Sequence, residues 1–177
     1  MPASIDRFLS AFRARDFSTP KRFEAKIYFP QNNRFQIDPA SGYEVMTLRC
    51  ETAEFPARTL ATTEQKVYGP IEKFPYLTTY NDLDLTFILD GEMTQKKIFD
   101  DWLDLVNPQE SYDFSYKEDY IGEIEISQYD QENIETYKVL FNQIYPISVG
   151  QLALDWNAEG YHKLTVTFAY TSWISMK

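Results

Sequence analysis

Tyr137-Lys138-Val139-Leu140-Phe141 begins the stretch of sequence that decides the fold. The stretch continues through Tyr145-Pro146, which predicts a turn, and then through Ser148-Val149-Gly150-Gln151-Leu152 and Leu154-Asp155-Trp156-Asn157. It ends in residues 161–173, where apolar side chains alternate with small or polar ones; the apolar set is Leu164, Val166, Phe168 and Tyr170. Alternation with a period of two among β-branched and aromatic residues predicts one long, half-buried strand over 161–173.

Length and composition indicate one β-rich domain. The chain has 177 residues, which is enough for a single sizeable core, and its 13 Phe and 13 Tyr fit a β-dominated fold. No run of about 18 apolar residues occurs and residues 1–7 lack an apolar signal core, so we expect no membrane partner. Because Cys50 is the only cysteine, we expect no intrachain disulfide and a reducing compartment during synthesis.

The net charge of -10 is unevenly distributed. Residues 1–60 carry 9 basic and 7 acidic side chains, net +2, whereas residues 61–177 carry 8 basic and 20 acidic ones, net -12. An acidic surface of this kind repels nucleic acid as a specific ligand. The alternative interpretation is that the charge serves solubility alone.

The N-terminal third predicts one helix and two strands. Apolar residues at helical spacing predict a short amphipathic helix over 4–14, inside an N-terminal arm formed by residues 1–20; they are Ile5, Phe8, Leu9 and Phe12. Alternation predicts a first strand over 23–29 and a second over 44–50, and the Pro, Asn and Gly residues of 30–42 predict a loop between them.

A strand, the main helix and another strand are predicted next. Leu83, Leu85, Phe87 and Leu89 share one face of a strand over 82–89. The apolar stripe of a helix over 92–107 includes Phe99 and Trp102, and Asn107-Pro108 stops this helix. Asp100, Asp101 and Asp104 lie in its C-terminal half, where the helix dipole disfavours them, so they suit contacts with another surface. A polar, aromatic loop over 109–119, a strand over 120–129 and a turn at 130–133 follow.

Residues 51–80 predict a stiff, extended excursion from the domain. Pro56, Pro70 and Pro75 restrict its backbone, and few large aliphatic side chains are available to bury it on its own. A segment of this kind suits a contact arm that reaches a neighbouring molecule. The alternative is an ordinary long hairpin.

Motifs that would indicate catalysis or metal binding are missing from the sequence. His162 is the only histidine, so no Cys/His cluster has metal-ligand spacing, and none of the glycines forms a phosphate-binding loop. Two carboxylate pairs occur, Asp82 with Asp84 and Glu123 with Glu125, but alternation places both on polar strand faces where water keeps them ionised. Asp155 either lines a pocket beside Trp156 or begins the turn over 155–160. We therefore expect no enzyme activity, no cofactor and no metal.

Three parts of the chain, residues 5–29, 50–106 and 137–173, resemble the tail tube proteins of contractile-tailed phages and the related baseplate tube proteins. The likeness lies in the order Tyr-Pro, Val-Gly-x-Leu-x-Leu-Asp-Trp and a Thr/Val/Phe strand at the C-terminal end. It lies also in Pro56-Ala57-Arg58, Tyr68-Gly69-Pro70 and Lys73-Phe74-Pro75-Tyr76 in the middle. Residues 30–42 and 107–119 have no counterpart in this pattern.

The resemblance implies a mainly β (α+β) fold: an antiparallel β-sandwich or barrel with one main flanking helix, whose strands join a ring-wide barrel. It implies stacked homohexameric rings that conduct DNA through the lumen without specific binding. The partners would be other copies of the chain, the tail sheath protein, and baseplate and tail-terminator proteins. The protein would be part of the virion tail, and would occupy the host cytoplasm before assembly.

Two sets of residues are candidates for roles in such a tube. Strand-face carboxylates are expected to line the lumen: Glu123, Glu125, Asp82 and Asp84. Residues of the N-terminal helix and of the excursion over 51–80 are expected to make contacts between rings or subunits: Phe8, Phe12, Arg58, Tyr68, Pro70, Phe74 and Tyr76. Alternatives are a baseplate ring that initiates the tube, a tube of a phage-derived injection device, and a monomeric β-sandwich that binds ligands through 111–120.

Overall fold

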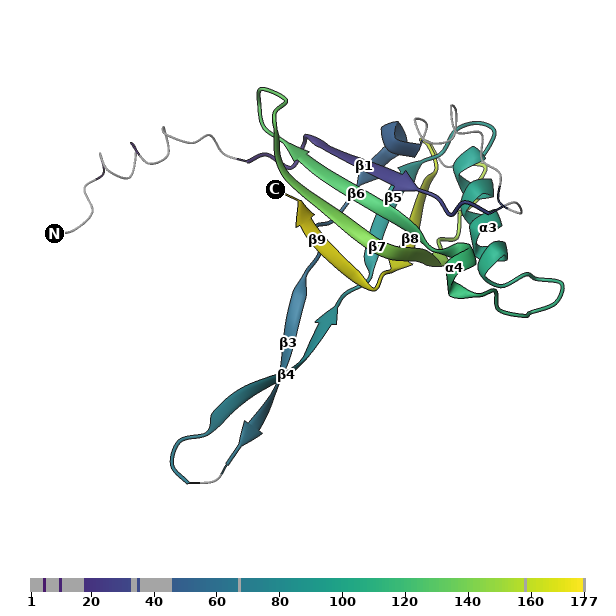
Figure 1. Cartoon of the computed structure of the whole chain (residues 1–177). Coiled ribbons are helices and arrows are strands. Elements are labelled where there is room, and N and C mark those ends of the chain that lie inside the picture. Colours follow the sequence, from purple (N-terminus) through teal and green to yellow (C-terminus); the bar gives the residue numbers. More distant parts are fainter. Residues whose placement is uncertain are drawn as a thin grey trace.

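β-Strands dominate the computed structural model, which describes residues 5, 10, 18–32, 35, 46–66, 68–157 and 159–176. In this part of the chain the elements are β1 (Phe23–Tyr28), β2 (Cys50–Thr52), β3 (Arg58–Gln65), β4 (Glu72–Tyr80), β5 (Leu83–Ile88), α3 (Thr94–Val106), α4 (Lys117–Tyr120), β6 (Gly122–Tyr129), β7 (Glu135–Val149), β8 (Lys163–Ala169) and β9 (Ser172–Met176). Figure 1 shows a twisted main sheet, a helix beside it and a long hairpin that leaves it. The mainly β fold with one main flanking helix is confirmed.

The main sheet is antiparallel and is built around its longest strand, β7. Its order is β1-β6-β7-β8-β5-β2, and β9 also pairs with β7. The first part of β7 lies between β6 and β9, and its last residues pair with β8. Register shifts in both the β6–β7 and the β7–β8 pairs mark bulges, which bend strands and increase their twist. The sheet therefore curls toward a barrel.

Alternation along the strands fills the inside of this curl, as predicted. Leu83, Leu85 and Phe87 of β5 are at most 3% exposed. Their register partners on β8 are fully buried: Phe168, Val166 and Leu164. On the other side of the core, Ile124 and Ile126 of β6 are equally buried. Burial of such side chains contributes about 1.5–3 kcal/mol each, so this inner face is the main source of stability.

Helix α3 closes one side of the core with aromatic side chains. Phe99 and Trp102 are completely buried, and both rings contact Phe168 of β8, at centroid distances of 5.8 Å and 5.9 Å. The indole Nε1–H of Trp102 donates to the carbonyl oxygen of Tyr120, 2.8 Å away. Gly122 is required beside this ring, because a Cβ there would lie 2.4 Å from the Tyr28 carbonyl oxygen and 3.1 Å from the indole.

Asp90 caps the start of α3. One of its carboxylate oxygens accepts a hydrogen bond from the backbone N–H of Thr94 at 2.8 Å, and the Gln95 side chain accepts one from the backbone N–H of Asp90 at 3.0 Å. Burial alone would raise the pKa of Asp90, but the hydrogen bonds from Thr94 and the nearby Arg49 charge outweigh it and lower this pKa. The reciprocal bonds satisfy backbone donors that a helix start leaves without partners.

The strand predicted over 44–50 is wrong. Residues 46–49 are helical, and strand pairing begins only at Cys50. Met46 is 1% exposed and anchors this turn in the core, and Met, Leu and Arg have high helix propensity. Residues 36–45 lie outside the described part of the chain. The helix predicted over 4–14 also lies outside it, except for Ile5 and Ser10, and so do Phe8 and Phe12.

Two predictions for the C-terminal stretch need correction. Tyr145-Pro146 does not form a turn: both residues continue β7 and pair with Ala169 and Phe168, and Pro146 is accommodated at the bulge that follows it. The long strand predicted over 161–173 is divided into β8 and β9. The break after Ala169 changes the alternation, so that Trp173 and Ser175 pair with the inward-facing Phe141 and Val139.

Candidate assembly surfaces

The most prominent surface feature is the hairpin formed by β3 and β4. Its two strands pair only with each other, over eight register pairs from Arg58–Tyr80 to Gln65–Glu72. Figure 1 shows it projecting away from the main sheet. With nine residues in β4, the hairpin is about 30 Å long at ~3.3 Å per residue. The excursion predicted over 51–80 is thus a two-stranded ribbon.

Both faces of this hairpin carry exposed apolar side chains. Leu60 is 51% exposed, Phe74 44% and Tyr76 68%. At the tip, Tyr68 is fully exposed, and Gly69 has a φ of +94°, which favours glycine. All five inter-ring candidates in this region lie on the hairpin and are exposed: Arg58, Tyr68, Pro70, Phe74 and Tyr76. An isolated two-stranded ribbon is marginally stable in water, so this ribbon needs a partner surface.

Aromatic contacts fix the base of the hairpin to the main sheet. Tyr80, the last residue of β4, contacts the ring of Tyr170 at a centroid distance of 5.9 Å. Phe55, which precedes β3, contacts Tyr137 of β7 edge-on at 5.2 Å. The hairpin therefore leaves the domain at the β5 end marked by Leu83 and Phe168.

An ion network covers the outward face of β1, β6 and β7. Glu125, 8% exposed, lies 2.9 Å from the Lys138 ammonium and 3.9 Å from that of Lys26. Lys26 lies 3.2 Å from Glu24, and Glu24 accepts a hydrogen bond from the Tyr129 hydroxyl at 2.8 Å. The hydrogen bond to Glu24 raises the pKa of Lys26 despite partial burial, and the one to Glu125 does the same for Lys138.

The four lumen candidates lie in different local settings. Glu123 and Glu125 share the outward face of β6, as predicted, but only Glu123 is exposed, since the two lysines surround Glu125. Asp84 faces outward from β5 and accepts a hydrogen bond from the Thr167 hydroxyl at 2.6 Å. Asp82 precedes β5 and is exposed. Glu125 therefore presents no free charge to solvent, and Glu123 does.

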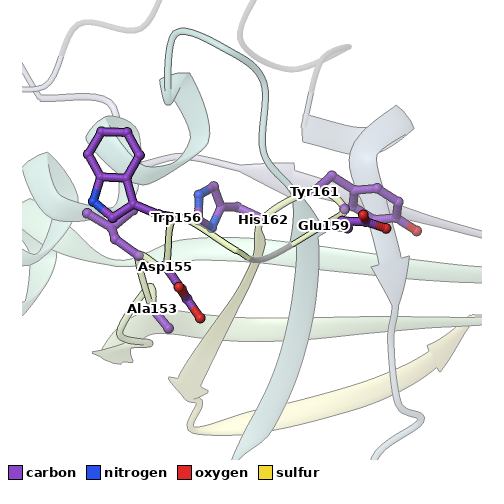
Figure 2. A pocket seen from close by; sticks show the side chains of 8 residues that line it. Ala153, Asp155, Trp156, Glu159, Tyr161 and His162 are labelled. Carbon is purple, nitrogen blue, oxygen red and sulfur yellow. The ribbon is translucent and has the colours of Figure 1, made fainter.

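The loop between β7 and β8 forms a cavity of about 420 Å³. Figure 2 shows Trp156, His162 and Tyr161 around it, and its lining also includes Leu154, Asp155 and Glu159. Trp156 is fully exposed and Leu154 is 83% exposed. Asp155 combines the two roles considered from the sequence: it lines the cavity, and its carboxylate accepts a hydrogen bond from the Asn157 N–H at 3.0 Å. The sequence did not predict the cavity, because its walls lie on both sides of a turn.

Two further surfaces lie near the helix. Asp100 pairs with Lys96, and Asp104 accepts a hydrogen bond from the backbone N–H of Gln109 at 2.9 Å. The α3–α4 loop carries three aromatic side chains that are each more than 70% exposed: Tyr112, Phe114 and Tyr116. Both surfaces are available to a partner outside the domain.

Several kinds of site have no representative among the described residues. No group of three or more His, Cys, Asp or Glu side chains there could hold a metal ion. No helix in the same ranges has the length and apolar character needed to cross a membrane. Cys50 lies within this part, and burial raises the pKa of its thiol to about 12, so it stays protonated and unreactive at neutral pH.

Solved structures with the same fold come from contractile injection systems. A chain of the extracellular contractile injection system PVC, in its extended sheath–tube complex, is 12% identical with a TM-score of 0.63, and 98% of each chain is covered. A chain of the PVC sheath/tube terminator is 13% identical with a TM-score of 0.65, covering 92% of this chain and 99% of that one. A chain of the anti-feeding prophage baseplate is 14% identical with a TM-score of 0.64, covering 92% and 97%.

The sequence itself matches a family model. A search of curated proteins finds no match. Residues 18–176, however, match the model described as phage tail tube protein, and this range includes the sheet, the hairpin and α3. The chain therefore belongs to the phage tail tube protein family.

Proposed function

We propose that this protein is a structural tube subunit whose copies close into hexameric rings and stack into a hollow tube, and that it is not an enzyme. The observation that carries the proposal is the hairpin of β3 and β4, which exposes apolar side chains on both faces and pairs with no other strand of the described chain. A feature of this kind is stabilised by a neighbouring molecule. Family membership identifies that neighbour as another copy of the chain.

Open sheet edges support ring formation. β1 and β2 end the order of the main sheet, and β9 pairs with β7 along one edge only. Edge strands expose unpaired backbone N–H and C=O groups, and pairing with an adjacent chain satisfies them. A ring-wide barrel built from the curled sheets of several subunits would remove these edges. The baseplate structure with the same fold was solved with sixfold symmetry, which supports six subunits for the ring proposed here.

The tube would conduct DNA, and its outer surface would bind a sheath. An acidic bore lets DNA move because phosphates gain no counterion release by binding to it. The outer surface would include α3 with its aspartates, and the neighbour solved in a sheath–tube complex supports a sheath partner. Baseplate and terminator proteins would contact the two ends, and the tail of a virion would be the final location, after synthesis in the host cytoplasm.

A specific observation favours a second function within the same family. The three structures compared above belong to extracellular injection systems or the anti-feeding prophage, including a baseplate. The chain could thus form the tube of an injection device that carries protein, or the baseplate ring that initiates a tube. Purified tubes loaded with DNA or with protein distinguish the cargoes, and addition of a truncated baseplate ring distinguishes initiator from tube subunit.

Negative-stain microscopy combined with light scattering tests the proposal. Purified protein at rising concentration is expected to form rings about as wide as six domains, and then open tubes. A protein that stays monomeric at the highest concentration contradicts the proposal. That result would favour a monomeric binding domain, with ligand contacts in the aromatic loop over 111–120.

A further inference from the structure

The hairpin tip and the β7–β8 cavity lie toward opposite ends of the domain. β5 and β8 pair over six register pairs, from Leu83–Phe168 to Ile88–Lys163, which corresponds to roughly 17–20 Å. The base of the hairpin contacts Tyr170 at the first end, through Tyr80. The cavity begins at the other end, at His162, directly before β8. One molecule therefore cannot seat its own hairpin in its own cavity without crossing the length of the sheet.

The cavity has fixed walls. The His162 carbonyl oxygen accepts a hydrogen bond from the Leu89 N–H at 3.0 Å, which ties the loop to the end of β5. The Lys163 ammonium lies 5.4 Å from the centre of the Tyr161 ring and 2.6 Å from a carboxylate oxygen of Glu51. The loop is thus fastened to β5 and β2. Its volume of about 420 Å³ falls in the range of ~300–1,000 Å³ that is typical of ligand-binding clefts.

The chemistry of the cavity complements that of the hairpin tip. Exposed Trp156 offers an apolar wall, and Asp155 and Glu159 add two carboxylates that form no ion pair with any described residue. The tip offers Tyr68, fully exposed, and Ile71, 47% exposed. Lys66 precedes them and is likewise without an ion-pair partner in the described ranges, whereas Lys73 is paired with Glu64 at 3.6 Å.

We propose that the β7–β8 cavity of one subunit receives the hairpin tip of a second copy in the adjacent ring. Tyr68 and Ile71 would pack against Trp156, and Lys66 would pair with Asp155 or Glu159. This inference rests on the proposed tube function and names the acceptor site for its hairpin. Two different patches at opposite ends of one chain make a head-to-tail contact, and such contacts propagate from molecule to molecule unless they close into a ring. The apolar side chains at both sites become buried in this way.

Disulfide trapping in the full chain tests this contact. The double variant Tyr68→Cys with Trp156→Cys places one thiol at the tip and one in the cavity, and Cys50 remains buried. Oxidised tubes are expected to give a ladder of covalent species on a non-reducing gel that extends well beyond six subunits. A matched control joins Tyr68→Cys to Tyr112→Cys, which is equally accessible but lies on the α3–α4 loop, and it is expected to give no ladder.

The outcomes separate this proposal from that of the tube. Tubes by microscopy without a ladder overturn the cavity as acceptor and leave the tube function intact. A ladder that stops at six subunits overturns docking between rings, because it shows contact within one ring. A ladder of equal strength in the control overturns specificity. Protein that forms neither rings nor tubes overturns the tube function itself, and the docking with it.

A charge exchange gives a second readout that needs no oxidation. Lys66→Asp is expected to raise the protein concentration at which tubes appear by about 10- to 30-fold, the effect of removing one strong interface contact. Adding Asp155→Lys to it is expected to restore much of this loss, because the pair is re-formed with reversed sign. Failure of the second change to rescue tube formation, with both variants folded by circular dichroism, contradicts the pairing.

Discussion

Trp102 and Trp156 lie in opposite environments, and each indicates what its part of the chain does. Trp102 is completely buried between α3 and β8, whereas Trp156 is fully exposed at the cavity. We expect Trp102→Ala to reduce the free energy of unfolding by about 3–5 kcal/mol, because it leaves a large cavity and removes the bond to Tyr120. Trp156→Ala serves as the control and should leave it unchanged. Urea unfolding of dilute protein measures both. Normal soluble yield and an unchanged midpoint for Trp102→Ala would contradict its place in the core.

Glu125 stabilises the outward face of the sheet through its two lysines. Glu125→Gln should reduce the free energy of unfolding by about 1–3 kcal/mol, because Lys138 would lose its closest carboxylate and remain only 23% exposed. Glu123→Gln, two residues earlier on the same face and exposed, should change it by less than about 0.5 kcal/mol. Equal effects of the two variants, measured by urea unfolding, would contradict a structural role that is special to Glu125.

Asp90 gives the start of α3 a dependence on pH. Its pKa in the folded chain lies below the ordinary value of 3.8, so the folded state holds its carboxylate ionised more strongly than the unfolded state does. The stabilisation is complete above the ordinary pKa and is lost as the pH falls through the lowered one. Asp90→Ala should therefore lower the melting temperature at pH 7, and the difference from the unchanged protein should shrink below about pH 4. A difference that is constant from pH 7 to pH 3 would argue against the cap.

Residue-level alternation predicted most of the core correctly. Along β5 and β6 each second side chain is buried, because one face of each strand meets the core and the other meets solvent or an ion network. The same rule could not predict that Glu125 is enclosed. Its partners Lys26 and Lys138 lie far from it in the sequence, and only the pairing of β6 with β1 and β7 brings them together.

At the scale of elements, the hairpin is the part whose stability depends most on assembly. Deleting residues between Thr59 and Lys73 should leave a folded chain that forms no tubes, since the main sheet and α3 make no use of these residues. The melting temperature of dilute protein and negative-stain microscopy check the two halves of this expectation. In the unchanged protein, amide exchange in β3 and β4 should slow on assembly. Long tubes from the shortened chain would exclude the hairpin as an essential contact.

Element boundaries were predicted well where one signal acted alone and poorly where tertiary pairing decided. Asp90-Gly91 and Asn107-Pro108 correctly bracket α3. Pro146 predicts a turn by its local chemistry, yet β7 continues through it, because β8 pairs there and a bulge accommodates the proline. The division between β8 and β9 arises in the same way, since β9 turns to pair with the first part of β7. Neither register is encoded in the local pattern of residues.

For the whole molecule, the distribution of charge connects the fold with the proposed tube. Residues 81–135 carry 16 acidic and 3 basic side chains, net -13. Within this range the main helix pairs Asp100 with Lys96, and β6 pairs Glu125 with Lys138. Exposed carboxylates such as Glu123 remain on the outward strand face. A strand face with free charge favours contact with water, and in a tube with the helix outside, that water is in the bore.

Glu123 is therefore the candidate best suited to a test of the lumen, with Asp82 and Asp84 next. Glu123→Lys should fold and assemble, because the side chain is exposed and outside the ion network. Its tubes should retain DNA in a nuclease-protected form that is released as salt increases, because each new lysine neutralises a phosphate and frees counterions. Glu110→Lys makes the same change of charge on the exposed α3–α4 loop and should bind DNA only in a nuclease-sensitive form. Equal protection by both variants, or none by either, would place Glu123 away from the bore, and loss of assembly in Glu123→Lys alone would place it between subunits.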